Sequence, residues 1–177
     1  MSESYAETLA RPAARVVEPG AVVAVVLTWR GRVGLFKRSR RVGHDAGLWH
    51  CVTGYVEHGR PTQAEALREL FEETGLSVAE LTGFRVGPVL ALADTRGGVW
   101  RVHTFHARTE RRRLRLNWEH DAYRWVRGRY VARFDGQVPW LGQVLSAVLT
   151  PAPRIRPEAG GQHEAPSGAE GVEGGPE

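Results

Sequence analysis

The chain has 177 residues, the length of one domain, and can bury a hydrophobic core without disulfides or metal staples. Its single cysteine, Cys51, excludes an internal disulfide and is typical of a reducing compartment. No apolar run approaches the roughly 20 residues that a membrane-spanning helix needs, so we expect a cytoplasmic protein without membrane contacts.

Charge is distributed unevenly along the chain. The formal net charge is +4, yet residues 151–177 hold two arginines and five glutamates, so residues 1–150 carry a net +7. Lys37 is the only lysine, and the other 23 basic residues are arginines. A basic body suits anionic partners such as nucleotides or nucleic acid, but an arginine-rich composition alone does not distinguish between them.

The first part of the chain predicts an arm followed by strands. Residues 1–17 are polar and rich in alanine without a clear period, and we expect a flexible N-terminal arm. Ala21–Trp29 is apolar throughout, as a strand buried on both faces should be. A turn at Arg30-Gly31-Arg32 leads into a second strand, Val33–Lys37, so the two strands form a hairpin. A short strand is expected at Trp49–Thr53.

The second part predicts three more strands and a helix. Strands at Phe84–Ala93 and Val99–Ala107 are separated by Gly97-Gly98, which suits a hairpin turn. Another strand is expected at Tyr123–Val126. The apolar residues of Pro139–Leu149 have helical spacing, with the proline in the first turn.

Residues 151–177 consist mostly of Gly, Pro and Glu with few large apolar side chains, so we expect a disordered, acidic tail. The folded domain then spans residues 18–150. Its buried strands, hairpins and two amphipathic helices predict an α/β fold in which helices cover both sides of a sheet.

The most informative stretch is GYVEHGRPTQAEALRELFEETGL, residues 54–76, which contains the first of these helices. Thr62 and Glu65 have the spacing of a capping box, so Thr62 is expected to cap the helix and Gly75 to end it. At 100° per residue, the acidic side of the helix consists of Glu65, Arg68, Glu69, Glu72 and Glu73. The opposite side, expected to face the core, consists of Ala64, Leu67, Leu70 and Phe71.

Two interpretations of the acidic side remain open from this pattern: a solvated surface or a metal site. Glu69 and Glu73 are like charges four residues apart, which costs about 0.2–0.5 kcal/mol if both face water. The tight loop of Gly54, Glu57 and Gly59 can bring a carboxylate and backbone carbonyls beside this pair. Converging oxygens of this kind are what Mg²⁺ requires, and they leave coordination positions for phosphate.

These residues resemble the box of the Nudix hydrolase family, which is a glycine, five residues, a glutamate, seven residues, and Arg-Glu-apolar-x-Glu-Glu-x-Gly-apolar. Here it reads Gly54 and then, at the same spacing, Arg68-Glu69-Leu70-Phe71-Glu72-Glu73-Thr74-Gly75-Leu76. The resemblance implies an α/β/α sandwich with a mixed sheet over residues 18–150. It also implies Mg²⁺-dependent cleavage of a diphosphate bond in a nucleoside diphosphate derivative, with Mn²⁺ as an alternative ion.

The resemblance also implies roles for individual residues. Glu72 and Glu73 would be metal ligands, and Glu69 would be a metal ligand or the base that activates water. A backbone carbonyl near residues 53–54 would add a ligand. Structural support is expected from Gly54, Glu57, Arg68 and Gly75.

One position departs from the box, because its first glutamate falls at residue 60, which is Arg60. In the family this acid pairs with the box arginine, here Arg68, so two arginines are expected to face each other at a cost on the order of 1 kcal/mol. Glu57 or Glu65 could replace the lost partner. Because misplaced partners of metal ligands usually lower function 10–100-fold, we favour an active enzyme over a weakened nucleotide-binding or regulatory module.

Two segments resemble the branch of the family that acts on dihydroneopterin triphosphate and (deoxy)nucleoside triphosphates. They are WHCVTGYVE, residues 49–57, and EHDAYRW, residues 119–125. In that branch the glutamate of the second segment lies near the metal, so Glu119 is a candidate ligand or base; the alternative is an ordinary loop acid. The implied partner is a small nucleotide or pteridine triphosphate.

Three further residues are candidates for substrate binding. Arg38 and Arg40 follow the second strand and could bind phosphate through bidentate guanidinium contacts, although surface arginines are common in this chain. Trp49 could stack on a base, with core packing as the alternative. Arg111–Arg113 fits a solvated turn better than a nucleic-acid surface because it lacks interleaved aromatic residues. An RNA-directed enzyme is therefore the less favoured alternative, and a homodimer is compatible with the sequence.

Overall fold

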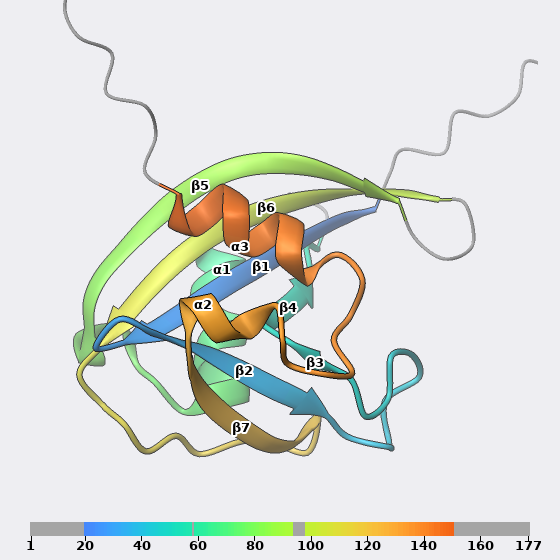
Figure 1. Cartoon of the computed structure of the whole chain (residues 1–177). Coiled ribbons are helices and arrows are strands. Elements are labelled where there is room, and N and C mark those ends of the chain that lie inside the picture. Colours follow the sequence, from blue (N-terminus) through green and yellow to red (C-terminus); the bar gives the residue numbers. More distant parts are fainter. Residues whose placement is uncertain (1–19, 58, 94–97, 151–177) are drawn as a thin grey trace, which may run out of the picture.

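The computed structural model describes residues 20–57, 59–93 and 98–150. The expected N-terminal arm, the acidic tail and Gly97 of the expected turn lie outside these residues. Figure 1 shows a curved sheet with α1 (Thr62–Thr74) on one face and α2 (Gly128–Val131) and α3 (Leu141–Leu149) on the other. This arrangement confirms the expected sandwich of helices around a sheet.

The sheet has seven strands and mixed topology. Its order is β3-β2-β1-β6-β5, while β4 also pairs with β1 and β7 with β2. Only the pairing of β1 with β6 is parallel among the pairings of the named strands in the described residues. The strands are β1 (Ala21–Trp29), β2 (Arg32–Arg38), β3 (Trp49–His50), β4 (Val52–Tyr55), β5 (Leu81–Ala93), β6 (Val99–Thr109) and β7 (His120–Arg127).

The β1–β2 hairpin forms as predicted. Trp29 pairs with Arg32, and the two residues between them, Arg30 and Gly31, have φ angles of 47° and 71°. Positive φ at both central positions is the geometry of the type I′ turn, whose twist matches that of the flanking strands.

Strand β1 runs through the centre of the sheet and is buried on both faces, which confirms the prediction. Ala24 and Val26 belong to the core on the α3 side, whereas Val23 and Val25 belong to the core on the α1 side. The α3 core includes Leu141, Val144, Leu145 and Val148, and the α1 core includes Ala66, Leu70 and Leu76. The helical period predicted for α3 therefore matches its buried face.

Several element boundaries differ from the predictions. The expected strand Trp49–Thr53 is two short strands, because β3 pairs with β2 whereas β4 pairs with β1, and the chain changes partner at Cys51. Pro139 precedes α3 instead of lying in its first turn, since Trp140 is the N-cap. Helix α2 and the 3₁₀ turn η1 (Val78–Glu80) were not predicted, because each is too short to show an apolar period.

The predicted cap of α1 is wrong at its start and right at its end. Pro61 is the N-cap, with no side-chain cap bond, and Thr62 is the first helical residue. Glu65 cannot complete a capping box because its side chain is buried and paired with Arg68. Gly75 ends the helix in the left-handed conformation, and its N–H donates to the carbonyl of Phe71.

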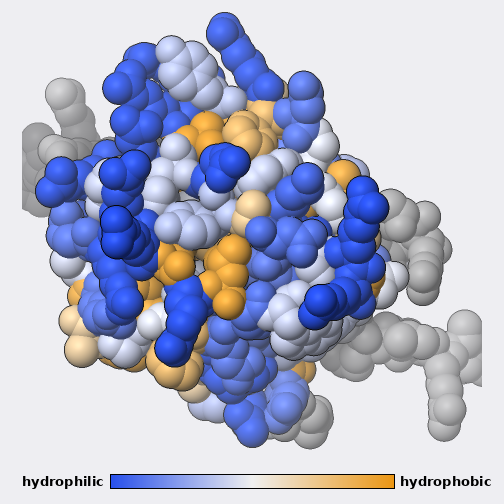
Figure 2. Space-filling model, turned by 90° about the horizontal axis from the view of Figure 1, so that it is seen from below, coloured by the Kyte–Doolittle hydropathy of each residue, from blue (hydrophilic) through white to orange (hydrophobic). Residues whose placement is uncertain are grey.

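The surface below β7 in Figure 1 is seen directly in Figure 2. Hydrophilic side chains, several of them long, crowd this face, and apolar atoms are confined to small areas between them. No helix within the described ranges is long and apolar enough to cross a membrane.

Candidate active site

Three of the four glutamates of α1 face the sheet. Glu65 and Glu73 are each 1% exposed and Glu69 is 9% exposed, whereas Phe71, expected in the core, is 51% exposed. Ala64 is exposed as well. The predicted core side of the helix is therefore right for Leu70, which is fully buried, and wrong for Ala64 and Phe71, and the three buried glutamates are not a solvated surface. Hydropathy misassigned the faces because a buried charge is tolerated where it is paired or hydrogen-bonded.

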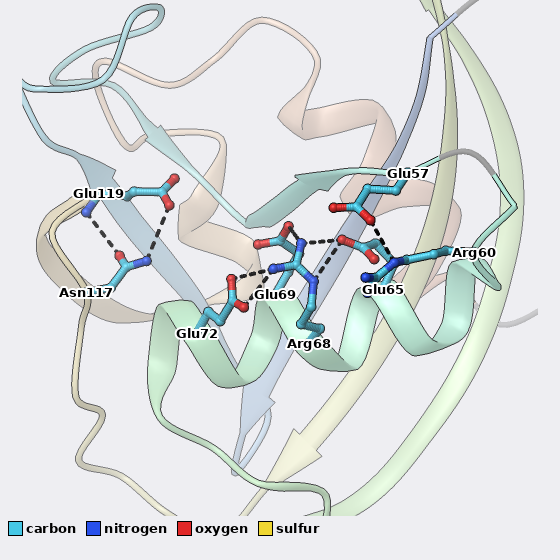
Figure 3. A network of polar contacts seen from close by, with 8 residues as sticks. All are labelled: Glu57, Arg60, Glu65, Arg68, Glu69, Glu72, Asn117 and Glu119. Atoms are coloured by element: carbon cyan, nitrogen blue, oxygen red, sulfur yellow. Dashed lines mark hydrogen bonds and ion pairs between the residues drawn. The ribbon is translucent and has the colours of Figure 1, made fainter.

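Arg68 joins three of the glutamates, as Figure 3 shows. Its Nε donates to Glu65 at 3.0 Å, one terminal nitrogen contacts Glu69 at 2.6 Å, and the other contacts Glu72 at 2.6 Å. The hydrogen bonds that the guanidinium donates to Glu65 and Glu72 raise its pKa. One cation thereby fixes the side chains along the acidic side of α1.

Arg60 does not disturb this network. Its Nε lies 2.7 Å from Glu57 in an exposed ion pair, while Arg68 takes Glu65 as its partner (Figure 3). Of the two partners predicted for Arg68, Glu65 is the one observed. Each arginine has its own carboxylate, so the expected unpaired repulsion between Arg60 and Arg68 does not arise.

Glu73 lies deepest in the site. The backbone N–H of Thr53 hydrogen-bonds to it, and its Oε2 lies 3.6 Å from His120 Nε2. Oε2 has no hydrogen-bond partner among the described residues. Burial raises the pKa of Glu73 well above its usual value, and the charges of Glu69 and Glu119 raise it further. The buried carboxyl group thus has no ion-pair partner other than the neutral His120, and the charge of Arg38 only partly offsets the rise in its pKa.

A pair of buried histidines that the sequence did not single out lies behind Glu73. The Nε2 atoms of His50 and His120 are 2.8 Å apart, and the two rings are stacked. Burial lowers the pKa of His50 well below its usual value and, aided by the charge of Arg38, lowers that of His120 to about 4. Both rings are therefore neutral at pH 7. The sequence signal was that His50 and His120 lie in the two segments, residues 49–57 and 119–125, that resemble one branch of the family.

Glu119 approaches from the loop before β7. Its N–H donates to Asn117 Oδ1 at 3.0 Å, and Asn117 Nδ2 donates to its carboxylate at 3.4 Å. Figure 3 shows this pair on the far side of the site from Glu65 and Arg60. The charge of Glu119 raises the pKa of both Glu69 and Glu73, so these carboxylates lie within electrostatic reach of one another.

The three candidate substrate-binding residues occupy different environments. Arg38 is 8% exposed and its Nε donates to the carbonyl of His44 at 3.1 Å, whereas Arg40 is exposed. Trp49 is half-buried and packs edge-on against Phe134, with ring centroids 5.0 Å apart, beside the α3 core. The structure brings the charge of Arg38 close to Glu73, and it leaves Trp49 beside the core on the opposite side of the sheet from α1.

The donor set fits a hard divalent cation, although the described residues hold no ready-made group of three metal-ligating side chains. The carboxylates of Glu69 and Glu72 form ion pairs with Arg68. Two observations favour a cation: Glu73 has an unpartnered buried oxygen, and burial raises the pKa of Glu69 to about 7 despite Arg68. Clustered carboxylate oxygens with unmet positive charge suit Mg²⁺ or Mn²⁺.

Comparison with known proteins identifies the family. A model of the NUDIX domain matches residues 18–144. The chain belongs to the NUDIX family. This Nudix protein is 35% identical over 114 residues to "Putative 8-oxo-dGTP diphosphatase 2" of Mycobacterium tuberculosis (strain CDC 1551 / Oshkosh), an alignment that covers 63% of the chain and 72% of the relative.

Solved structures share the fold. A MutT NUDIX hydrolase from Burkholderia pseudomallei matches with a TM-score of 0.62 and 22% identity, over 74% of this chain and 98% of that one. A bifunctional NMN adenylyltransferase/ADP ribose pyrophosphatase from Francisella tularensis matches with a TM-score of 0.64 and 18% identity, over 75% of this chain. The chain spans only 41% of that bifunctional protein. The expected Nudix fold is confirmed, and membership of the family makes this protein a hydrolase of diphosphate bonds in nucleoside diphosphate derivatives.

Proposed function

We propose that this Nudix hydrolase cleaves a diphosphate bond of a nucleoside or pteridine triphosphate with the help of Mg²⁺. The unpartnered, buried Oε2 of Glu73 is the observation that carries the proposal. A carboxylate oxygen without a donor or cation is costly in a protein interior, so its retention beside Glu69 and Glu119 calls for a positive ligand.

Glu69, Glu72 and Glu73 would hold the metal, and Glu119 is a further candidate. Bound Mg²⁺ supplies charge neutralisation at the phosphate oxygens and lowers the pKa of a coordinated water. To serve as ligands, Glu69 and Glu72 must give up part of their contact with Arg68. The guanidinium can then remain with Glu65, which is fully buried and close to it.

Either Glu69 or Glu119 would accept the proton of the attacking water. Burial, opposed by Arg68, brings the pKa of Glu69 to about 7, which is suited to a general base near neutral pH. The water oxygen forms a bond to one phosphorus, the bond from that phosphorus to the bridging oxygen breaks, and the departing phosphate keeps the electron pair. Asn117 holds the Glu119 carboxylate in place for the alternative assignment.

The arginines after β2 would bind the substrate phosphates. Arg40 is exposed and free to make bidentate contacts, while the buried Arg38 would act mainly through its charge. A stacking role for Trp49 would have to use the part of its ring that Phe134 leaves uncovered.

The proposed substrate class rests on two independent resemblances. The relative from Mycobacterium tuberculosis is named for 8-oxo-dGTP, a purine nucleoside triphosphate. The segments at residues 49–57 and 119–125 resemble the branch that also acts on dihydroneopterin triphosphate. Both substrates contain a triphosphate and a fused-ring heterocycle, and we propose this shared chemistry.

The test is release of pyrophosphate and phosphate from purine, 8-oxopurine, pyrimidine and pteridine triphosphates and from ADP-ribose, with Mg²⁺ or with a chelator. We expect Mg²⁺-dependent turnover that is greatest for a fused-ring triphosphate and is lost in Glu73→Gln. Equal turnover in Glu73→Gln would refute the metal site. Preference for ADP-ribose would refute the substrate class.

The alternative is a Nudix module that binds nucleotides without turnover. The sequence raised it because of Arg60, but Arg60 is paired with Glu57 and leaves Arg68 to Glu65. Tight nucleotide binding with no product from any compound, together with activity appearing in Arg60→Glu, would establish this alternative.

A further inference from the structure

Two arginines without acidic partners meet where β2 begins and β7 ends, and a third, Arg124, lies three residues earlier in β7. Arg32 and Arg127 are directly opposite in the antiparallel register of these strands. Like charges at opposite positions destabilise a sheet. Neither residue, nor Arg124, forms an ion pair within the described part of the chain. This concentration of positive charge calls for an anionic ligand.

The arginines line a cleft of about 380 Å³ between β7, the start of β2 and the segment of α2. Its walls include Arg32, Arg124, Trp125, Arg127, Tyr130 and Phe134. The volume lies in the range of small-ligand sites, and guanidinium groups beside aromatic rings suit a ligand that carries both phosphate and a planar ring.

An aromatic platform continues the cleft along the surface. The rings of Trp29 and Trp125 are 5.8 Å apart, and Trp125 is also a wall of the cleft. The guanidinium groups of Arg30 and Arg112 each lie 5.6 Å from the centre of the Trp29 ring. Trp125 Nε1 donates to the carbonyl of Arg112 at 2.8 Å and fixes the arginine-rich loop against the platform.

This contact changes the interpretation of Arg111–Arg113. The sequence around these arginines lacks the aromatic residues typical of a nucleic-acid surface. In the folded protein, Trp29 of β1 and Trp125 of β7 place aromatic rings beside these arginines. At the other end of the cleft, Tyr130 is 42% exposed and lies 4.8 Å from the Arg129 guanidinium.

We propose that this arginine–aromatic face, defined by Trp29, Arg32, Arg112, Trp125, Arg127 and Tyr130, binds single-stranded nucleic acid. A single strand offers a phosphate and an unpaired base at every step, which match the alternating guanidinium groups and rings. A duplex hides the faces of its bases, and a lipid surface offers phosphate without rings.

The face is separate from the proposed hydrolytic site. Strand β7 starts at His120 beside Glu73 and ends at Arg127, which at about 3.3 Å per residue puts roughly 20 Å between them. The cleft lies around this end of β7, where Phe134 packs against the α3 core and Trp125 against the edge of the α1 core, so distance along β7 separates it from the glutamates. Strand binding is therefore expected without metal and without turnover.

The experiment measures fluorescence anisotropy of a labelled thymidine strand of about 12 nucleotides, within the usual site size. The strand lacks a terminal phosphate and the buffer contains a chelator, so the hydrolytic site does not contribute. The test variant combines Arg32→Gln with Arg127→Gln, the two arginines of the face that lie opposite each other. The control combines Arg41→Gln with Arg108→Gln, which removes the same charge at exposed positions; Arg108 lies over Gly83 of β5 and Arg41 follows the far end of β2.

We expect the test variant to bind at least tenfold more weakly than the control and to lower the slope of log affinity against log salt by about 1.4, since two phosphate contacts are lost. Tyr130→Ala should weaken binding about fivefold or more with an unchanged slope, because it removes stacking and no charge. Thermal melting verifies that every variant is folded. Absence of strand binding at low salt, equal weakening in the control, or tighter binding to duplex DNA or phosphatidylserine vesicles would overturn the proposal.

Discussion

Gly54 lies directly against the carboxylate of Glu69. A Cβ built on residue 54 would be 2.1 Å from Glu69 Oε1 and 2.3 Å from its Cγ, both far inside contact distance. Strand β4 and helix α1 can approach each other at this point only because residue 54 has no side chain. The box glycine therefore acts by giving Glu69 its position, and no unusual φ angle is involved.

We predict that Gly54→Ala displaces the Glu69 side chain and lowers kcat by roughly 100-fold, the scale of a 1 Å misplacement of a catalytic group. Gly142→Ala is the matched control, because its Cβ would meet nothing within 4 Å in α3 and alanine favours the helix. Steady-state kinetics and thermal melting are measured together. Unchanged kcat in a folded Gly54→Ala protein would contradict the assignment of Glu69.

The two ion pairs near the start of α1 should differ in strength. Glu65 is buried against Arg68, whereas Arg60 and Glu57 are both more than half exposed. Glu65→Gln should lower the free energy of unfolding by about 1–3 kcal/mol, since it weakens charge-assisted hydrogen bonds. Glu57→Gln, the same chemical change in an exposed pair, should cost at most about 1 kcal/mol. Urea unfolding measures both, and equal losses would show that Glu65 is not the main partner of Arg68.

The sequence predicted the fold and the family better than it predicted which way α1 faces. Ordered spacing from Gly54 to Leu76 gave the family, and the apolar run of β1 gave a strand buried on both faces, because both depend on local residue order. The burial of Glu65, Glu69 and Glu73 depends on Arg68 and on the backbone of β4. Because β4 lies outside the helix, the periodicity of the helix alone does not reveal this contact.

Contacts between distant parts of the chain explain the other features that the sequence did not predict. His50 and His120 are 70 residues apart in the chain and meet only when β3 and β7 both pair with β2. The stacking of Arg112 on Trp29 similarly requires the loop after β6 to return to the end of β1. No local pattern in the sequence contains either contact.

The environment of His106 predicts that the folded protein loses stability as the pH falls. Arg85 Nε donates to its Nδ1 at 3.1 Å, so this nitrogen is an acceptor and the proton resides on Nε2, 2.8 Å from Thr28 Oγ1. Burial, with the charges of Arg85 and Arg108, lowers the pKa of His106 to about 4. Between about pH 6.5 and pH 4 the unfolded chain binds the extra proton, so the contribution of His106 to stability is lost as the pH falls through this window.

The measurement is the melting temperature at about pH 7 and about pH 5 for the natural chain and for His106→Gln. Glutamine can keep a donor near Thr28 but does not titrate, so the variant should lose less stability over this interval. An identical fall in both proteins would show that His106 contributes nothing to the acid sensitivity.

Metal binding should be visible in stability without any substrate. A cation that binds only the folded state stabilises it by RT ln(1 + [L]/Kd), so saturating Mg²⁺ should raise the melting temperature of the natural chain above its value in a chelator. Glu73→Gln should abolish this rise.

In the chelator the same variant should be at least as stable as the natural chain, because the raised pKa of Glu73 means that the folded state disfavours its charge, and the amide has none. Glu110→Gln serves as the control, since its exposed carboxylate pairs with Arg30 away from α1. A full Mg²⁺-dependent rise in Glu73→Gln would show that the ion binds elsewhere and that the unpartnered oxygen of Glu73 is not its ligand.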